Sequence, residues 1–314
     1  MTDGRASPVH EAILIAGPTG SGKSRLAVEL AAHLDGVVIN ADSMQVYRDL
    51  RILTARPSDE EEARVPHRLY GHVPGEEAYS AGRYVREAAV AIGEAHGGGR
   101  LPIVVGGTGL YFKALTEGLS PIPDVPREIR IHWRREADRL GARALHEELA
   151  RRDPAMADRL NPFDAQRVTR ALEVLEASGR SLLHWQGLPG TPVLDPGAVL
   201  PVVLRPARDA LHRATDRRLI AMVAEGALDE VRRLIERRLD DGLPIMRALG
   251  VAPFIAHCQG AIDLDEAIAR AQAETRQYVK RQETWLRRNM SAWKSFVAQE
   301  NGSSYAQIID FIRR

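Results

Sequence analysis

A short apolar run leads directly into a glycine-rich loop near the start of the chain, in the stretch AILIAGPTGSGKS at residues 12–24. The loop fits the spacing G-x-x-x-x-G-K-[S/T] from Gly17 to Ser24, and an amphipathic helical pattern follows it. A strand, loop and helix in this order direct successive backbone N–H groups, and the positive end of the helix, at a phosphate group. The motif therefore predicts a phosphate-binding loop at the edge of a parallel α/β sheet.

Three features of the loop suit it to a phosphate ligand. Its glycines allow backbone conformations that a Cβ excludes, Lys23 adds a positive charge, and the Ser24 hydroxyl is suited to Mg²⁺. Only 4 of the 43 basic residues are lysines, and one of them occupies this loop. The alternative, a glycine-rich turn that binds nothing, does not account for a lysine and a hydroxyl in register.

Composition limits the class of protein. A chain of 314 residues with 44% hydrophobic residues can form one large domain or two ordinary ones. The single Cys258 excludes an intramolecular disulfide and a cysteine-based zinc site, and no leading apolar segment indicates a signal peptide or membrane span. We expect a cytoplasmic protein with no membrane partner, and we expect it to be a monomer. The net charge of +1 neither requires nor excludes a nucleic-acid partner, so any basic surface must be local.

The first part of the chain alternates strand and helix patterns. Helices are predicted over Lys23–Leu34 and from about Ser80 to His96, between the apolar runs AILIA, VVINA and LPIVVGG. Continuously apolar strands separated by amphipathic helices are typical of a parallel sheet buried on both faces. The expected fold is therefore α/β, with a P-loop NTPase-like parallel sheet as its core.

Two segments rich in proline and glycine, at 118–126 and 187–197, bracket a separate helical unit. The predicted domains are a first part of the core at 1–126, a helical insertion domain at 127–186 and a second part of the core at 187–314. After the second bracket, AVLPVVLR predicts a strand that returns to the core sheet. The remainder is mostly helical, and one stretch, Arg270–Arg288, has a local net charge of +4.

Every pattern inside the insertion is helical. Helices are predicted over Arg127–Leu140 and Ala142–Arg151, and a third is capped at Asp164, begins at Ala165 and stops at Gly179. Residues 127–180 contain 12 arginines and 10 acidic residues. Composition alone leaves two interpretations of these arginines open, an ordinary solvated surface or a surface that binds an anion.

A second motif follows the predicted strand VVINA, in DSMQVYRDLRILTARP at residues 42–57. Ligands of parallel sheets bind beyond the carboxyl ends of the strands, so we expect Asp42, Ser43 and Gln45 beside the phosphate loop. An alternative role for Asp42 is that of a Mg²⁺ ligand in an ordinary NTPase. Gln45 and Tyr47 do not serve that role.

Six segments, in the same order along the chain, resemble bacterial tRNA dimethylallyltransferases, also called tRNA isopentenyltransferases, of the IPP transferase family. They are GPTGSGKS, NADSMQVYRDLRILTARP, PHRLYGH, VGGTGLYFKALTEGLSPIP, DAQRVTRALEV and TRQYVKRQETWLRR, spread over residues 17–288. The resemblance implies transfer of a dimethylallyl group from dimethylallyl diphosphate to N6 of the adenosine immediately 3′ of the anticodon, with release of diphosphate in the presence of Mg²⁺. It also implies that the helical insertion binds the anticodon stem of tRNA.

The resemblance carries roles to particular residues. It places the diphosphate on the loop residues Gly17, Pro18, Thr19, Gly20, Ser21, Gly22, Lys23 and Ser24, with Ser24 also holding Mg²⁺. It implies tRNA contacts by Asp42, Ser43, Met44, Gln45, Thr108, Arg130, Gln166, Arg167, Val168, Thr169 and Arg170. Residues 166–170 also fit an ordinary amphipathic helix with Val168 inward and Gln166, Arg167 and Arg170 on its other faces, and the two interpretations are compatible. We further predict Arg218 as a second cation on the diphosphate, although Arg213 and Arg217 leave that register ambiguous.

The implied reaction gives the phosphate loop a different task from that of a kinase. Diphosphate is the leaving group, so the loop and Lys23 stabilise negative charge that develops as the allylic C–O bond breaks. We predict that Asp42 accepts a proton from the adenine amine, with the Thr108 hydroxyl as its companion, and the catalytic candidates are therefore Asp42, Thr108 and Lys23. Because the adenine must leave its stack to reach them, Ser43, Met44 and Gln45 are the candidates for reading the base.

Some segments depart from the family pattern. The chain has Thr54-Ala55-Arg56-Pro57 where relatives usually have TAKP, and LGVAP at 249–253 where they have a GYKE-like segment. Three other functions remain open: a small-molecule or nucleoside kinase, an isopentenyltransferase acting on a free adenine nucleotide, and a non-catalytic RNA-binding ATPase. The helical insertion argues against the free nucleotide, because a mononucleotide needs no extra domain.

Overall fold

The chain forms two compact units in a computed structural model that describes residues 10–297, 308, 309 and 311. The core unit comprises Met1–Thr116 and Val193–Arg314, and the helical unit comprises Glu117–Pro192. The helical unit is wider at both ends than the predicted 127–186. Val125 of the first bracket is buried in its hydrophobic core, which explains why this bracket belongs with the helices.

A six-stranded parallel sheet organises the core unit, with the strand order β3-β2-β4-β1-β5-β6. The strands are β1 (Ala12–Ala16), β2 (Gly36–Asn40), β3 (His67–Arg68), β4 (Leu101–Gly106), β5 (Val199–Leu204) and β6 (Lys294–Phe296). In the centre, Ile13 of β1 lies beside Ile103 of β4 and Leu200 of β5. The predicted α/β fold and the returning strand are confirmed, whereas the edge strand β6 lies where the sequence indicated mainly helix.

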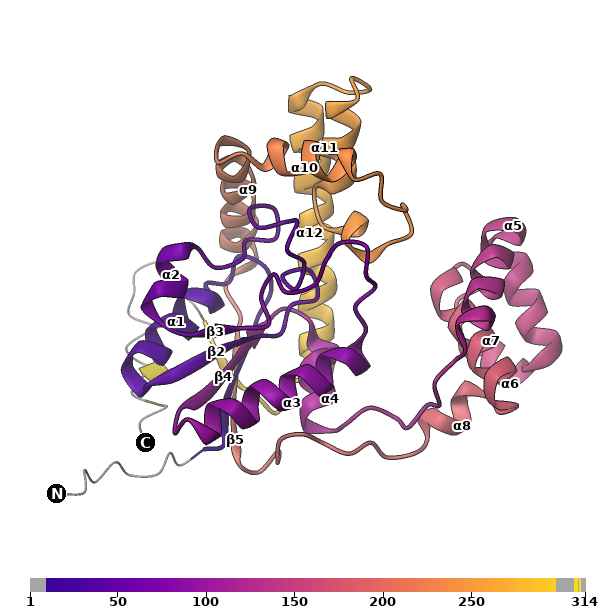
Figure 1. Ribbon diagram of the computed structural model, residues 1–314, viewed down its shortest axis with the longest axis horizontal. Coiled ribbons are helices and arrows are strands. Elements are labelled where there is room, and N and C mark those ends of the chain that lie inside the picture. The colour runs from indigo at the N-terminus through magenta and orange to yellow at the C-terminus, as the bar shows by residue number, and fades with distance from the viewer. Residues whose placement is uncertain (1–9, 298–307, 310, 312–314) are drawn as a thin grey trace. The chain divides into compact units, whose positions relative to one another are not determined.

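Helices cover both faces of this sheet, which explains why its strands are continuously apolar. Ile13 and Ile15 pack against α1 (Lys23–Leu34) on one face. Leu14 points to the other face, where α3 (Ala81–Gly97) and α4 (Gly109–Thr116) pack. Figure 1 shows α1 and α3 on opposite sides of the strands.

A second hydrophobic core forms around the segment that follows Asp42. Val46, Tyr47 and Leu50 are fully buried there, against helices from the C-terminal half of the chain. The elements of this region are α2 (Asp59–Arg64), α9 (Arg208–Ala224), α10 (Ala227–Glu236), the 3₁₀ helix η1 (Pro244–Arg247), α11 (Val251–Cys258) and α12 (Leu264–Asn289). Helix α12 extends from α11 to the sheet (Figure 1), where Leu286 joins the core beside α4.

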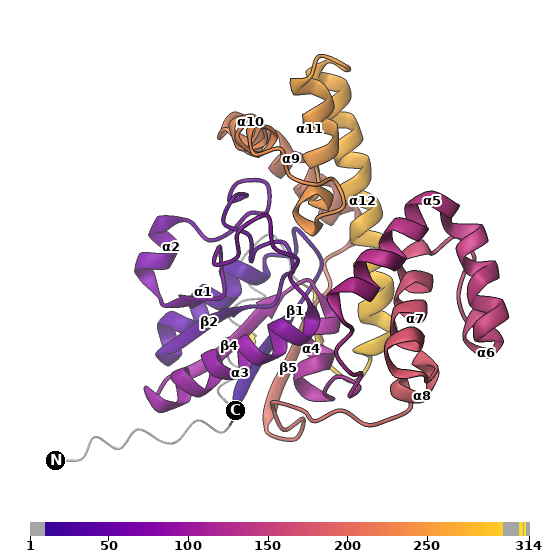
Figure 2. The same cartoon turned by 45° about the vertical axis from the view of Figure 1, so that its right-hand side comes forward.

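The helical unit has its own hydrophobic core. It contains α5 (Arg127–Arg152), α6 (Pro154–Ala157), α7 (Ala165–Ser178) and α8 (Leu182–Gln186), and α5 and α7 pack side by side (Figure 2). The predicted ends of α7 are confirmed, because the Asp164 side chain accepts a hydrogen bond from Arg167 N and Gly179 adopts a left-handed conformation. The predicted break after Leu140 is confirmed at Gly141, which has φ +75° inside α5. Over the ranges that the structure describes, no helix combines the length and apolarity needed to cross a membrane.

Candidate active site

The phosphate loop connects the buried strand β1 to the first turn of α1. Gly20 and Gly22 have φ values of +81° and +82°, a region that residues with a Cβ rarely adopt. A Cβ on Gly17 would lie 2.6 Å from the Ser21 hydroxyl oxygen, which is packed beneath the loop. All three glycines of the motif are therefore required by the observed conformation.

The loop does not direct every N–H group at a ligand. Ser21 N donates to the carbonyl of Pro18 at 3.2 Å, and Thr19 N donates to Oε1 of Gln282 at 2.9 Å. Lys23 and Ser24 begin α1, so their N–H groups have no acceptor within the helix and lie at its positive end. The backbone N–H groups of Thr19 and Ser21 already donate within the protein, so they are not available to diphosphate in this conformation. Of the predicted loop, the N–H groups of Lys23 and Ser24 remain at the positive end of α1.

Three charged side chains interact at the mouth of the loop. Burial of the Lys23 ammonium lowers its pKa to about 8, the Asp42 carboxylate raises it, and the Arg218 guanidinium lowers it further. Burial also lowers the pKa of Arg218, and Asp42 again acts in the opposite direction. Arg213 and Arg217 are exposed on the same helix, so the structure favours Arg218 as the second cation beside the loop.

The lowered pKa of Lys23 predicts a pH dependence of diphosphate binding. Above a pH of about 8 the free protein loses the positive charge on Lys23, so we expect kcat/KM for the predicted diphosphate substrate to fall as pH rises through about 8. We expect kcat to be insensitive to this change, because bound diphosphate keeps the lysine protonated. Steady-state kinetics between pH 6.5 and 9.5 at saturating tRNA, values chosen to span about one pH unit or more on each side of the transition, measure both.

The matched control is Lys23→Arg, whose guanidinium stays charged throughout this pH range. This variant should be slower than the wild type and should lack the decline of kcat/KM near pH 8. A decline of equal size in both proteins would contradict the assignment of the ionisation to Lys23.

Strands β2 and β4 are neighbours in the sheet, and their carboxyl ends bring Asp42 and Thr108 together. Thr108 N donates to the carbonyl of Ala41 at 3.1 Å. The Thr108 hydroxyl accepts from Ser43 N at 3.0 Å and donates to the Ser43 hydroxyl at 3.3 Å. A Cβ on Gly106 would overlap the backbone of Ala41, so this close approach of the two strands requires glycine.

The Asp42 carboxylate is anchored through one oxygen. Oδ1 accepts a hydrogen bond from Met44 N at 2.9 Å, and Asn40 holds the Asp42 backbone by accepting from its N at 2.8 Å and donating to its carbonyl at 2.9 Å. Among the described residues, no group donates a hydrogen bond to Oδ2. One carboxylate oxygen is therefore fixed and the other is open to a ligand.

Three tyrosines interact electrostatically with Asp42; Tyr111 is buried, and Tyr70 and Tyr278 are partly buried. Burial raises the pKa of Tyr70, Tyr111 and Tyr278, and the negative charge of Asp42 raises the pKa of each phenol further. The phenols therefore stay neutral at physiological pH. The Asp42 carboxylate therefore interacts electrostatically with two cations, Lys23 and Arg218, and with neutral phenols.

Gln45 and Met44 are more structural than the sequence indicated. The Gln45 amide nitrogen donates to the carbonyls of Thr54 and Ala55, each at 2.9 Å, and Met44 packs against the second core. Because the Gln45 amide nitrogen already donates both of its hydrogens, only its amide oxygen remains available to hydrogen-bond a base. Of this stretch, Ser43 and Asp42 lie at the contact between β2 and the Thr108 loop.

Sequence reasoning missed the residue that shapes the rest of this segment. Glu230 of α10 is buried, and its carboxylate accepts hydrogen bonds from the backbone N of Arg51, Ile52 and Leu53 at 2.7, 2.8 and 3.1 Å. These three donors satisfy a charge that would otherwise be costly to bury. No local pattern around Glu230 indicated this role, because its partners lie far away in the sequence.

The predicted tRNA contacts of the helical unit divide into exposed and buried residues. Arg130, Gln166 and Arg167 are exposed, and Arg170 is partly exposed and lies 3.2 Å from Glu173. Val168 is buried in the core of the helical unit, as the amphipathic pattern predicts, and Thr169 is also buried, so the predicted tRNA contacts of these two side chains are corrected. The Thr169 hydroxyl donates to the carbonyl of Ala165 at 2.7 Å. The amphipathic pattern of α7 fixes this division, and these two side chains support the helix from within.

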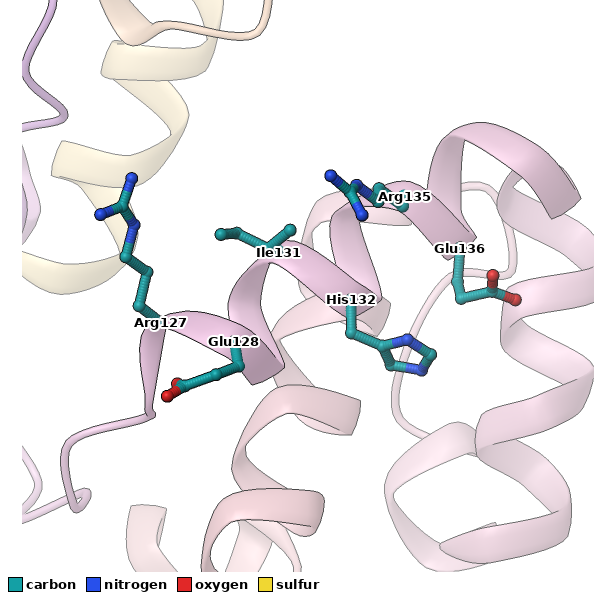
Figure 3. A pocket seen from close by; sticks show the side chains of 6 residues that line it. All are labelled: Arg127, Glu128, Ile131, His132, Arg135 and Glu136. Atoms are coloured by element: carbon teal, nitrogen blue, oxygen red, sulfur yellow. The ribbon is translucent and has the colours of Figure 1, made fainter.

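A cleft of about 790 Å³ lies along the first turns of α5. Figure 3 shows Arg127, Ile131 and Arg135 directed to one side of the helix and the acidic residues Glu128 and Glu136 to another. The sequence singled out only Arg130 here. The i, i+4 spacing of Arg127, Ile131 and Arg135 is the signal that could have found this stripe.

The protein groups near the loop suit a magnesium ion only when a diphosphate supplies further oxygen ligands. No group of three or more His, Cys, Asp or Glu that could hold a metal occurs within the described part of the chain. The Ser24 hydroxyl is exposed at the start of α1, beside Lys23. Mg²⁺ usually keeps several waters and binds through one or two protein groups plus substrate phosphates, which suits a hydroxyl beside a diphosphate site.

The chain is similar to known proteins over most of its length. The family model described as IPP transferase matches residues 45–289, and a second model, described as isopentenyl transferase, matches residues 10–72. The chain belongs to the IPP transferase family. Members of this family named tRNA dimethylallyltransferase include one from Nitrobacter hamburgensis, 55% identical over 90% of each chain. Another, from Parvibaculum lavamentivorans, is 50% identical over 98% of this chain and 97% of its own.

Solved structures of the IPP transferase family have the same fold. The full-length tRNA isopentenylpyrophosphate transferase of Bacillus halodurans is similar with a TM-score of 0.68 and 33% identity, over 96% of this chain and 95% of its own. A eukaryotic dimethylallyltransferase acting on tRNA is similar with a TM-score of 0.81 and 28% identity, over 96% of this chain and 79% of its own. The similarity therefore covers both units of the chain.

Proposed function

We propose that this chain transfers the dimethylallyl group of dimethylallyl diphosphate to N6 of the adenosine immediately 3′ of the anticodon in tRNA, releasing diphosphate. The observation that carries the proposal is the meeting of a phosphate loop and an unblocked carboxylate oxygen of Asp42 beside Lys23 and Arg218. The relatives named tRNA dimethylallyltransferase support the choice of tRNA. We also propose that the protein acts in the cytoplasm as a monomer.

The first half of the reaction separates diphosphate from the allylic carbon. The C–O bond breaks, its electron pair stays on the diphosphate oxygen, and the positive end of α1, Lys23 and Arg218 stabilise the growing negative charge. Ser24 would hold Mg²⁺ beside the diphosphate, where the ion would supply positive charge that opposes the same negative charge. The stabilisation is greatest after bond breaking, so these groups favour the transition state over the bound substrate.

The second half forms the C–N bond to the adenine amine. N6 attacks the allylic carbon and must lose one proton, which Oδ2 of Asp42 accepts. Oδ1 stays bonded to Met44 N, so the carboxylate keeps its orientation during the transfer. The Thr108 hydroxyl, held by its contacts with Ser43, borders the same position and can hydrogen-bond the base.

The helical unit is proposed to bind the anticodon stem through its exposed side chains, above all Arg130, Gln166, Arg167 and Arg170. Replacing Arg130 or Arg167 by alanine should weaken tRNA binding and reduce the slope of log Kd against log salt concentration by about 0.7 to 0.9, because each removes one phosphate contact. Titrations of labelled tRNA at several salt concentrations measure the slope.

The matched control for these two variants is Arg100→Ala. Arg100 is exposed and precedes β4, so it lies at the amino-terminal end of the strands, whereas the site lies at their carboxyl ends. Its loss should leave the salt slope unchanged. Equal slopes in the Arg130, Arg167 and Arg100 variants would mean that the two arginines of the helical unit are only solvated.

The proposed activity has a direct test. The protein is incubated with Mg²⁺, dimethylallyl diphosphate and total tRNA, and the nucleosides are examined by mass spectrometry for an adenosine heavier by one dimethylallyl group. ATP should act at most as a weak competitor for the loop. ATP turnover on addition of a metabolite would instead favour a kinase, and prenylation of free AMP but not of tRNA would favour the free-nucleotide enzyme.

A further inference from the structure

Gln282 is a buried polar side chain to which the reaction described above gives no role. It lies on α12, it is 6% exposed, and both ends of its amide contact loops of the site. Its Oε1 accepts from Thr19 N of the phosphate loop at 2.9 Å, and its Nε2 donates to the carbonyl of Gly107 at 3.1 Å. One side chain thus connects the loop for the leaving group to the loop that carries Thr108.

The direction of this amide is fixed by its partners. A backbone N–H can only donate and a backbone carbonyl can only accept, so Thr19 requires the oxygen and Gly107 requires the nitrogen. Only a side chain that accepts at one end and donates at the other satisfies both. A carboxylate would face the Gly107 carbonyl with a second acceptor, and an apolar side chain would leave both backbone groups unpaired.

A second contact of α12 supports the same function. One turn after Gln282, the Trp285 ring occupies the space in which a Cβ on Gly109 would lie. A Cβ on Gly107 would likewise overlap the Gln282 amide. Two successive positions on one face of α12 therefore contact the loop between β4 and α4, and only Gln282 also reaches the phosphate loop.

We propose that Gln282 is a positioning residue that fixes the spacing between the diphosphate loop and the Asp42–Thr108 loop. The inference rests on the proposed function, because it is this reaction that must bring the allylic carbon and the adenine amine together. Reacting atoms must approach to about 3–3.5 Å, and a displacement of about 1 Å costs about 100-fold in rate. The Gln282 side chain, hydrogen-bonded to both loops, fixes the distance between the diphosphate site and the Asp42–Thr108 loop.

The test uses two near-isosteric variants of the full-length protein. Gln282→Met keeps the volume and removes both hydrogen bonds, and we expect its kcat to fall about 10- to 100-fold with little change in KM for tRNA.

Gln282→Glu can both accept and donate only while its carboxyl is protonated, and burial raises the pKa of such a group. The ratio of its kcat to that of the wild type should therefore rise at least about tenfold between pH 8.5 and pH 6. The same ratio for Gln282→Met should not change with pH.

A merely structural role would produce a different result. If Gln282→Met keeps kcat within about twofold of the wild type, or if the Gln282→Glu ratio does not depend on pH, the proposal is overturned. Thermal melting of each variant monitors the fold.

Calorimetric binding of inorganic diphosphate provides a readout that needs no tRNA. The affinity of Gln282→Glu for diphosphate should increase relative to that of the wild type as pH falls, and an unchanged ratio of the two affinities counts against the proposal. A wild type that binds diphosphate but prenylates no tRNA refutes the proposed function, and Gln282 is then judged on diphosphate binding alone.

Discussion

Asp42→Asn should lower the rate of transfer to tRNA by roughly 10²- to 10⁴-fold, the usual contribution of a positioned general base, while tRNA affinity changes little. Asparagine keeps the oxygen that accepts from Met44 N, so the backbone of this turn is preserved. Its amide nitrogen takes the place of Oδ2 and cannot accept the proton from N6. Single-turnover transfer and tRNA binding, each measured across a Mg²⁺ titration, give the two quantities.

The control and the contrary outcome are both defined. Asp35→Asn makes the same chemical change at an exposed position before β2, at the opposite edge of the sheet, and should leave the rate unchanged. If Asp42 is instead a magnesium ligand, as in a kinase, the variant should lose metal and diphosphate binding together. Recovery of its rate at high Mg²⁺ would then overturn the assignment of Asp42 as the base.

Removal of the helical unit should abolish specific tRNA binding and preserve diphosphate binding. The two ends of the unit leave the core at one point, because Val193 N and Leu194 N both donate to the carbonyl of Leu115, at 2.8 and 3.0 Å. A short glycine-serine linker can therefore replace residues 117–192 without stretching the sheet. We expect tRNA affinity to fall by about 10³-fold, the lower end of the difference between specific and non-specific nucleic-acid binding.

Three properties of the deletion variant are measured: its folding, its diphosphate binding and its tRNA binding. Circular dichroism and thermal melting report whether the core stays folded, calorimetry with inorganic diphosphate reports on the loop, and a filter-binding titration reports on tRNA. A folded deletion variant that still binds tRNA with nearly the affinity of the full chain would mean that the helical unit is not the tRNA-binding domain.

Local sequence patterns were sufficient for the parts of the fold that depend on neighbours along the chain. The phosphate loop, the exact extent of α1 and the cap of α7 at Asp164 were all predicted, because a glycine spacing, a helical period and a capping residue each act within one or two turns. The alternation of apolar strands and helices likewise predicted a parallel sheet. The edge strand β6 was missed, because three residues carry no usable period and pair only once β5 is in place.

Patterns were less informative about which predicted residues face a ligand. In the motif at 166–170, the helical pattern predicted that Val168 faces inward and that Gln166 and Arg167 do not, and both are confirmed, whereas the burial of Thr169 was not predicted. In the same way, the loop motif did not reveal that the Thr19 N–H is already bonded. A motif identifies a segment, and the packing of that segment decides the orientation of each side chain.

By itself, the sequence determined the chemistry available to this protein: a loop for phosphate, a carboxylate after the next strand, and an arginine-rich helical insertion. Only the tertiary structure decided which distant groups complete the site. Arg218 differs from the exposed Arg213 and Arg217 because it is more buried and interacts with Asp42. Glu230 is identified by the three backbone N–H groups that donate hydrogen bonds to its carboxylate. Gln282 meets Thr19 across 263 positions of sequence. Such pairs have no spacing that could reveal them, because the sheet and α12 must first pack before two residues so distant in the sequence come within hydrogen-bonding distance.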